Sequence, residues 1–265
     1  MGIREPDLRM LIDLVGRSKS KKSILQIGVI SLLASPQTVV QALADAGWCR
    51  REGDRYGFRH NAKAIGEILH SDGHILHEGL QGKVTVLPDF LFRAVGFDDV
   101  RSLDIAPHDS PTYLFDLNDA DVWQRIGRQF HTIVEMGTME HIFHVPNAMW
   151  NIAKMCAQGG EIIHVGPLNN QPNHGFYQFS PTLYYDFYEA NGFQVEEASL
   201  YQMLDKPAGM RFSAPYRRAM SFASPVPLDG HVYNFHCRVR KISEPHRMTI
   251  PMQGAYAAIE NWKPV

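Results

Sequence analysis

The sequence predicts an α/β fold in which helices cover both faces of a doubly wound, mainly parallel sheet of seven strands. From residue 84 onward, apolar runs rich in β-branched residues alternate with segments of helical periodicity, which is typical of parallel βαβ units. A hydrophobic fraction of 45% over 265 residues is ample for one large core. A last run, 231–242, alternates apolar and polar residues, which indicates one antiparallel edge strand.

The first 83 residues contain a helix, a strand and a second helix. Residues 7–17 have apolar side chains at helical spacing, and SILQIGVISLL (23–33) is consistent with a buried strand. SPQTVVQALADAGW (35–48) has Ser at the N-cap, Pro at the first helical position and Gly near its end. Residues 49–83 are rich in charge, Gly and His, so we expect an insertion or cap after the first strand.

The remaining elements follow from apolar periodicity between Pro, Ser and Gly residues. Residues 206–230 are irregular and rich in Pro and Gly, and we expect a lid or an interface loop there. The whole chain, 1–265, is expected to form a single domain. The expected helices are 88–96, 119–129, 144–160 and 180–193, and the further expected strands are 100–106, 112–117, 130–136, 161–167 and 194–201.

Charge and cysteine content narrow the function classes. The chain has 26 basic and 28 acidic residues, which is not the footprint of a nucleic-acid-binding protein. Cys49, Cys156 and Cys237 are far apart, so neither a disulfide framework nor a metal-binding pair is predicted. No secretory leader and no long apolar run is apparent. We therefore expect a cytoplasmic protein that has no nucleic-acid or membrane partner.

Acidic residues stand at the ends of two expected strands, where ligands bind in folds of this class. Asp104 lies near the end of the strand 100–106, and its carboxylate can accept hydrogen bonds from both hydroxyls of a ribose. The alternative is a helix cap or a loop ion pair. Asp116 follows in the next strand and can contact an adenine amino group or a sulfonium-bearing chain. Its alternative role is the N-cap of the next helix, for which Asp119 competes.

The segment EMGTMEH (135–141), at the carboxyl end of the strand 130–136, places several polar groups at the same edge of the expected sheet. Gly137 allows close approach of the backbone, and Glu135, Thr138, Glu140 and His141 lie around it in sequence. A Glu next to a His can serve as a general-base pair, or Glu140 can favour a helix N-terminus through the helix dipole. The HExxH spacing of metal sites is absent. His144, three residues after His141, is a conceivable second ligand, but no metal is predicted.

The segment HVGPLNNQPNHGFYQFSP carries more chemistry than a simple turn requires. Asn169, Asn170 and His174 can bind polar substituents, and His174 can act as a base. Phe176 and Tyr177 can wall a pocket against water, together with Phe179. The alternative for these aromatic residues is anchoring the following helix in the core.

The order of these residues resembles the class I S-adenosylmethionine-dependent methyltransferases over residues 90–201. FHTIVEMGTMEHIFHVPNAMWNIAKMCAQGGEIIHVGP is similar to the fourth strand of that superfamily, its following motif, and the helix and turn before its fifth strand. The pattern GTMEHIF…HGFYQFSP resembles a bacterial branch of methyltransferase-domain proteins that is commonly associated with surface-polysaccharide or secondary-metabolite loci. The resemblance implies a Rossmann-like fold and S-adenosyl-L-methionine as the cofactor.

By this resemblance, Asp104 matches the ribose-binding acid, Asp116 the acid near adenine, and the segment 135–141 lies beside the methionine moiety. In place of the first motif of the superfamily, E/DxGxGxG, the sequence LQIGVISLL keeps only Gly28 and has Gln26 at the acidic position. The cofactor-binding residues implied are Gly28, Asp104, Asp116, Leu117, Glu135, Gly137 and Thr138.

The expected function is methyl transfer to a small polar acceptor, sugar-like or another hydroxyl- or amide-bearing molecule, in polysaccharide or secondary-metabolite biosynthesis. His141 or His174 would be the catalytic base, and Asn169, Asn170 and Tyr177 would bind the acceptor. The alternative is a non-catalytic binding or scaffold protein on the same fold, which the altered first motif favours and the strand-end acids oppose. A homo-oligomer is compatible with the sequence.

Overall fold

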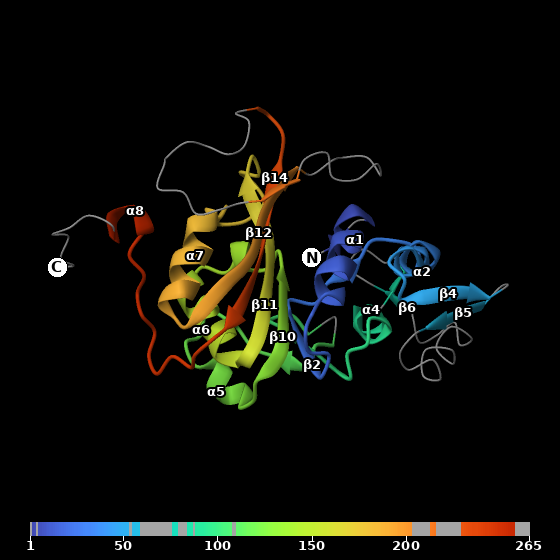
Figure 1. Cartoon of the computed structure of the whole chain (residues 1–265), viewed down its shortest axis with the longest axis horizontal. Coiled ribbons are helices and arrows are strands. Elements are labelled where there is room, and N and C mark those ends of the chain that lie inside the picture. Colours follow the sequence, from blue (N-terminus) through green and yellow to red (C-terminus); the bar gives the residue numbers. More distant parts are fainter. Residues whose placement is uncertain are drawn as a thin grey trace. The chain divides into compact units, whose positions relative to one another are not determined.

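Figure 1 shows the computed structural model of the chain. Its residues divide into two compact units. The first unit contains the described residues up to Asp116 together with Phe130–Met136, and the second contains those in Leu117–Gln129 and from Gly137 onward. The residues that the structure describes are 2–3, 5–52, 55–58, 76–78, 84–86, 88–107, 110–202, 213–215 and 229–257.

A parallel sheet forms the centre of the first unit. Within this unit the strand order is β10-β2-β8-β9, and each neighbouring pair is parallel. Every residue of β2 is buried. The strand order reverses between β2 and β10, and in sheets of this kind ligands bind outside the carboxyl ends of the strands at such a point. The strands are β2 (Ser23–Ile27), β8 (Asp99–Asp104), β9 (Tyr113–Leu114) and β10 (Phe130–Met136).

Helix α2 (Pro36–Asp45) begins where Ser35 and Pro36 predicted it, and α4 (Pro88–Ala94) begins at Pro88. In α2, the Ser35 hydroxyl accepts a hydrogen bond from the Thr38 amide at 3.1 Å, and Pro occupies the first turn. Helix α1 (Glu5–Gly16) packs against α2, and α4 packs against β8.

The predicted strand 23–33 divides at Gly28. Its first part is β2, whereas β3 (Ser31–Leu32) belongs to a second sheet with strand order β1-β3-β7-β6. Most of the predicted insertion at 49–83 lies outside the described residues. Its described parts are an antiparallel hairpin and strand β6. The elements concerned are β1 (Gly2–Ile3), β4 (Cys49–Glu52), β5 (Arg55–Phe58), β6 (Leu76–Glu78) and β7 (Val84–Val86).

The second unit contains an antiparallel set of strands in the order β13-β12-β14-β11. In Figure 1, β11, β12 and β14 run side by side, and α7 lies against them. The short strand β13 (Ser213–Pro215) falls within the predicted lid or interface loop 206–230, most of which lies outside the described residues. The long strands are β11 (Cys156–Asn169), β12 (Phe193–Gln202) and β14 (Tyr233–Lys241).

The antiparallel strand predicted at the edge, β14, lies between β11 and β12. The alternation of apolar and polar residues in this strand indicated an edge, but the structure buries His236, Arg238 and Lys241. Arg238 has a side chain only 5% exposed and forms an ion pair with the similarly buried Glu161, N to O distance 2.7 Å. Charges paired in this way can occupy an interior strand, which corrects the position of this strand.

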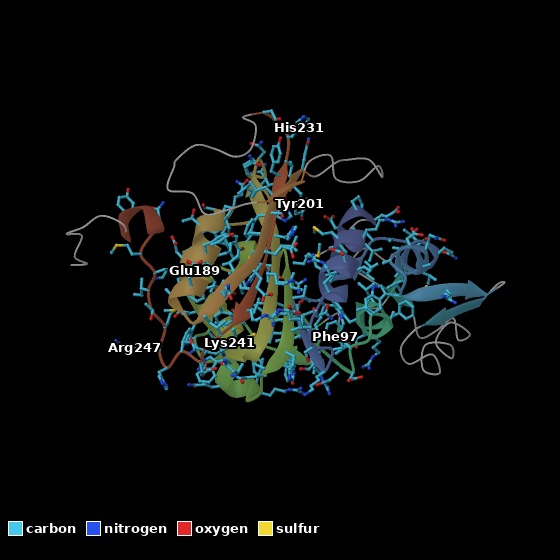
Figure 2. The ribbon with its side chains drawn as sticks, viewed as in Figure 1. Phe97, Glu189, Tyr201, His231, Lys241 and Arg247 are labelled. Atoms are coloured by element: carbon cyan, nitrogen blue, oxygen red, sulfur yellow. The ribbon has the colours of Figure 1, made fainter. Side chains whose placement is uncertain are left out.

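Helices of the second unit flank its strands. Helix α6 ends at Met155, before the predicted Gly-Gly stop, because Cys156 already begins β11. Lys241 lies at the end of β14 (Figure 2), and its ammonium group donates to the carbonyl oxygens of Ala153 and Cys156. The helices are α5 (Val122–Ile126), α6 (Val145–Met155), α7 (Pro181–Ala190), α8 (Gly254–Ala257) and the 3-10 turn η1 (Met139–His141).

All seven predicted strands are present, helices connect most of them, and the fold class is the predicted Rossmann-like α/β class. Among the described residues, no helix is long and apolar enough to cross a membrane.

Candidate functional site

Asp104 closes strand β8 and holds two backbone groups. Its Oδ2 accepts a hydrogen bond from the amide of Val29 at 2.8 Å, and its Oδ1 accepts one from Ala106 at 2.9 Å. The carboxylate is half-buried. It therefore fixes the loop that leaves β2, and each of its oxygens keeps a second lone pair.

The loop after β2 is bonded within the chain. Gly28 adopts a φ of +71°, in the left-handed region that glycine tolerates, and its amide donates to the carbonyl oxygen of Leu103 at 2.8 Å. The amide of Ile30 donates to Oε1 of Gln26 at 3.2 Å. With the amide of Val29 on Asp104, all three consecutive N–H groups of the loop have partners inside the protein.

Two further predicted residues lie in the first unit. Glu135 is 1% exposed, near the end of β10 and opposite Ile27 of β2. Asp116 is half-buried and follows β9, and the residue before α5 is Asp121, so Asp116 is not the cap of that helix. Leu117 is buried and begins the second unit.

In the second unit, Gly137 and Thr138 lead into η1. Gly137 has a φ of +73°, and its amide donates to the carbonyl oxygen of Val165 on β11 at 2.9 Å. Thr138 is the residue before η1. This turn places Glu140 in the interior and His141 at the surface.

A second segment is fixed to this turn by its main chain. The amides of Phe176 and Tyr177 both donate to the carbonyl oxygen of Glu140, at 2.8 and 3.3 Å. The approach is so close that a Cβ at Gly175 would lie 2.6 Å from the same oxygen. The bend that carries His174 is therefore held against η1.

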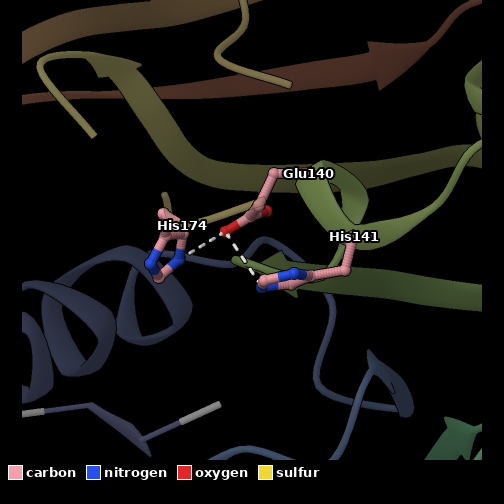
Figure 3. Close-up of side chains that lie close together, drawn as sticks. All are labelled: Glu140, His141 and His174. Carbon is pink, nitrogen blue, oxygen red and sulfur yellow. Dashed lines mark ion pairs between the residues drawn. The ribbon is translucent and has the colours of Figure 1, made fainter. Parts of the chain in front are cut away.

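These contacts bring Glu140, His141 and His174 together (Figure 3). Oε1 of Glu140 lies 3.3 Å from Nε2 of His174 and 4.0 Å from Nε2 of His141. The Glu140 side chain is 1% exposed, whereas those of His174 and His141 are 40% and 49% exposed. A buried carboxylate beside two accessible imidazoles suits general acid–base chemistry, because it can orient a ring that exchanges protons with a substrate.

Asn169 and Asn170 contact the segment that leads into β14. Oδ1 of Asn169 accepts from the amide of Tyr233 at 3.0 Å, and Nδ2 of Asn170 donates to the carbonyl oxygens of Asp229 and His231. Asn169 and Asn170, the amide residues predicted to bind the acceptor, thus each use one side-chain polar atom to fix residues 229–233.

Aromatic residues surround the same bend. The Tyr177 hydroxyl donates to the carbonyl oxygen of Phe143 at 2.9 Å, and its ring stacks on that of Phe179. Phe179 is buried, as expected of a core anchor, whereas Phe143 and Phe176 are 61% and 67% exposed and meet edge to face. Phe143 is two residues after His141, and Phe176 is two residues after His174. One member of this exposed aromatic pair therefore follows each histidine closely along the chain.

The three cysteines are buried and are not suited to act as nucleophiles. Burial raises the pKa of Cys156 to about 12 and that of Cys49 to about 11, and Cys237 is also buried. Nucleophilic thiolates need a lowered pKa and access to solvent.

Sequence reasoning placed Glu140 next to His141 but missed that His174 joins them. The available signal was Gly175, since a glycine directly after a polar residue in a long connection indicates close approach of another backbone. The contacts of Asp104 with the β2 loop were also missed, because a hydrogen bond between a side chain and a distant backbone leaves no periodic pattern.

No protein-family model matches the chain, and neither does any curated protein. Among solved structures, it is similar to a Haloferax volcanii protein solved with the Trm112 methyltransferase activator, with 11% identity, a TM-score of 0.44, and coverage of 93% of this chain and 92% of that one. A Bacillus halodurans protein described as a candidate methyltransferase gives 10% identity, a TM-score of 0.40, and coverage of 89% and 99%.

TehB from Haemophilus influenzae gives 15% identity and a TM-score of 0.38 over 57% of this chain, which spans about half (52%) of TehB.

Proposed function

We propose that the chain is an S-adenosyl-L-methionine-dependent methyltransferase that acts on a small polar, hydroxyl- or amide-bearing acceptor. The observation that supports this most is the position of Asp104 and Gly28. They lie at the carboxyl ends of the neighbouring parallel strands β8 and β2, beside the point where the strand order reverses. A nucleoside cofactor binds at this place in doubly wound sheets.

The residues at this edge fit a nucleoside. Asp104 is half-buried, and each carboxylate oxygen keeps a lone pair for one ribose hydroxyl. Asp116 and Leu117 would lie near the adenine. Since the amides of the loop after β2 have partners in the chain, the methionine end would be held by the remaining predicted residues. These are Glu135, Gly137 and Thr138.

The bound cofactor would supply an electrophilic methyl group, and the residues of the chain would position the acceptor and remove its proton. His174 or His141 would take that proton, and the buried carboxylate of Glu140 would orient the ring. Asn169, Asn170 and Tyr177 each use one polar function inside the chain. Their remaining hydrogen-bonding groups would bind the acceptor.

The proposal extends to the source of the acceptor, the cellular location and the oligomeric state. A sugar-like or other small acceptor from polysaccharide or secondary-metabolite biosynthesis would meet the enzyme in the cytoplasm, where S-adenosyl-L-methionine is available. The enzyme would act there as a monomer or as a homo-oligomer.

One observation favours a second candidate, a non-catalytic binding or scaffold protein. The loop after β2 is closed on itself, with Val29 and Ile30 buried. A loop of this kind does not need a ligand to satisfy its amides.

Calorimetric titration with S-adenosylmethionine and with S-adenosylhomocysteine tests the proposal. We expect binding in the micromolar range, about −8 kcal/mol. Asp104→Ala should weaken it by about 10- to 100-fold, because hydrogen bonds to a charged group contribute about 1.5–3 kcal/mol.

The matched control is Gln26→Ala, which also removes an anchor of the loop after β2 but no carboxylate. It should leave affinity within a few-fold of the parent. Equal losses in both variants would mean that Asp104 acts only on the loop. No heat with either ligand would exclude the methyltransferase and leave the scaffold protein.

A further inference from the structure

We propose that Glu140, His141 and His174 form a binding site for a divalent cation of the zinc and iron(II) class. One carboxylate oxygen and one ring nitrogen from each histidine all lie within 4.8 Å of one another. Figure 3 shows the Glu140 carboxylate between the two rings. No predicted metal motif covers these residues, because they come from two segments of the chain.

The spacing of these atoms suits a metal ion. Ligand atoms about 2.0–2.1 Å from a tetrahedral zinc lie about 3.3 Å apart. The Glu140 Oε1 to His174 Nε2 distance is 3.3 Å, and that to His141 Nε2 is 4.0 Å. The His141 side chain is 49% exposed, so its ring can rotate to close the small remaining difference.

The backbone arranges the ligands before any ion binds. Glu140 and His141 share the turn η1, and the bend with His174 is tied to that turn by two main-chain hydrogen bonds to the Glu140 carbonyl oxygen. Gly175 makes this approach possible. A site held in this way loses little side-chain and loop freedom when an ion binds.

The donor set selects the class of cation. Two imidazoles and one carboxylate suit zinc and iron(II), whereas magnesium and calcium prefer oxygen ligands alone. Three protein ligands leave at least one coordination position for water or for an oxygen atom of a substrate. The exposed rings of Phe143 and Phe176 lie close to the ligands in sequence, so an acceptor bound there would also meet apolar surface.

The inference goes beyond the proposed methyl transfer and can be tested apart from it. The three ligands belong to the second unit, whereas Asp104 belongs to the first. A histidine bound to a metal through its acceptor nitrogen is no longer a base. The loaded and unloaded protein therefore offer different chemistry to an acceptor.

Titration of chelator-treated, full-length protein tests the site. Zinc binding would be followed by calorimetry and cobalt(II) binding by visible absorption, both near neutral pH. We expect one equivalent to bind, with magnesium unable to compete. His174→Ala and His141→Ala should each weaken zinc binding by about 100-fold or more, since loss of even a supporting partner of a ligand typically costs 10–100-fold.

His144→Ala is the matched control, because His144 is exposed and near η1 but outside the cluster. Its affinity for zinc should equal that of the parent. Glu140→Gln should also lose binding, and if this buried substitution prevents folding, the two surface histidine variants decide the question.

Absence of stoichiometric zinc and cobalt binding would overturn the proposal, as would equal affinity in His174→Ala and His144→Ala. Either result would leave the cluster as a proton-transfer group without metal. Titration of the chelator-treated protein with S-adenosylhomocysteine gives a separate answer for the cofactor site.

Discussion

A methyl group added at Gly175 would lie 2.6 Å from the carbonyl oxygen of Glu140 and 3.0 Å from its Cγ. Backbone at that distance has to move, so Gly175→Ala should push the bend away from η1 and separate His174 from Glu140. We expect a loss of about 1–3 kcal/mol in the free energy of unfolding, the usual cost of overpacking, measured by urea denaturation.

Gly230→Ala is the control for this substitution, because a Cβ at Gly230 meets no atom within 4 Å. The two variants change composition identically. If both unfold at the same urea concentration, the close approach at Gly175 carries no weight in the fold.

At the level of single residues, the sequence identified which side chains are unusual but not what they contact. The positions of Asp104 and Gly137 near strand ends could be predicted, because strand ends follow from periodicity. Gly28 was instead expected inside the strand 23–33, which the structure ends at Ile27. The contacts of Asn169 and Asn170 with residues 229–233 could not. They depend on a chain reversal whose path is set by tertiary packing.

Among the elements, helix α2 offers a test of its predicted N-cap. The Ser35 hydroxyl accepts from the amide of Thr38, so Ser35→Ala leaves that amide without its side-chain partner. We expect a loss of about 1 kcal/mol in the free energy of unfolding. Gln37→Ala, at an exposed position of the same helical turn, should cost clearly less in the same thermal or urea measurement. Equal costs would contradict a capping role.

The end of helix α6 gives a prediction that depends on pH. Burial by itself acts to raise the pKa of Glu244, but hydrogen bonds from Lys154 and Lys241 outweigh it, and the pKa lies below its usual value of 4.5. The Lys241 ammonium is fully buried and 2.5 Å from this carboxylate. Glu244 therefore stabilises the folded state mainly in its ionised form.

Glu244→Gln should accordingly lower the free energy of unfolding at pH 7. A lowered folded-state pKa means that the contribution is complete above about pH 4.5 and is lost as the pH falls through the folded-state value. Urea denaturation at a series of pH values should show the two proteins converging below about pH 4.5. A constant difference over the whole range would contradict the role of the charge.

For whole elements, helix and strand positions were predicted well because Pro, Ser and Gly delimit them. The exceptions have physical causes. The run 23–33 divides between two sheets because Gly28 turns the chain with a positive φ. Strand β14 was placed at an edge because its residues alternate between apolar and polar, whereas the buried ion pair of Arg238 with Glu161 allows an interior position. The periodicity of a single sequence indicates which residues are polar, but it does not indicate which strands lie next to one another in the sheet.

For the molecule as a whole, the chain crosses between the two units more than once. Strand β10 belongs to the first unit although residues 117–129 before it and residues from 137 onward belong to the second. Neither unit is a continuous piece of sequence, and this is invisible to composition or motif spacing. The cofactor site proposed in one unit and the metal site proposed in the other can nevertheless be titrated separately.

The position of β14 has a consequence for synthesis. Strands β11 and β12 both pair with β14, which lies between them but follows both in the chain. While a ribosome is still translating the codons before Tyr233, the neighbouring edges of β11 and β12 have no strand to pair with. Because unpaired strand edges promote association with other chains, we expect the nascent chain to be more prone to association before β14 leaves the exit tunnel than after it.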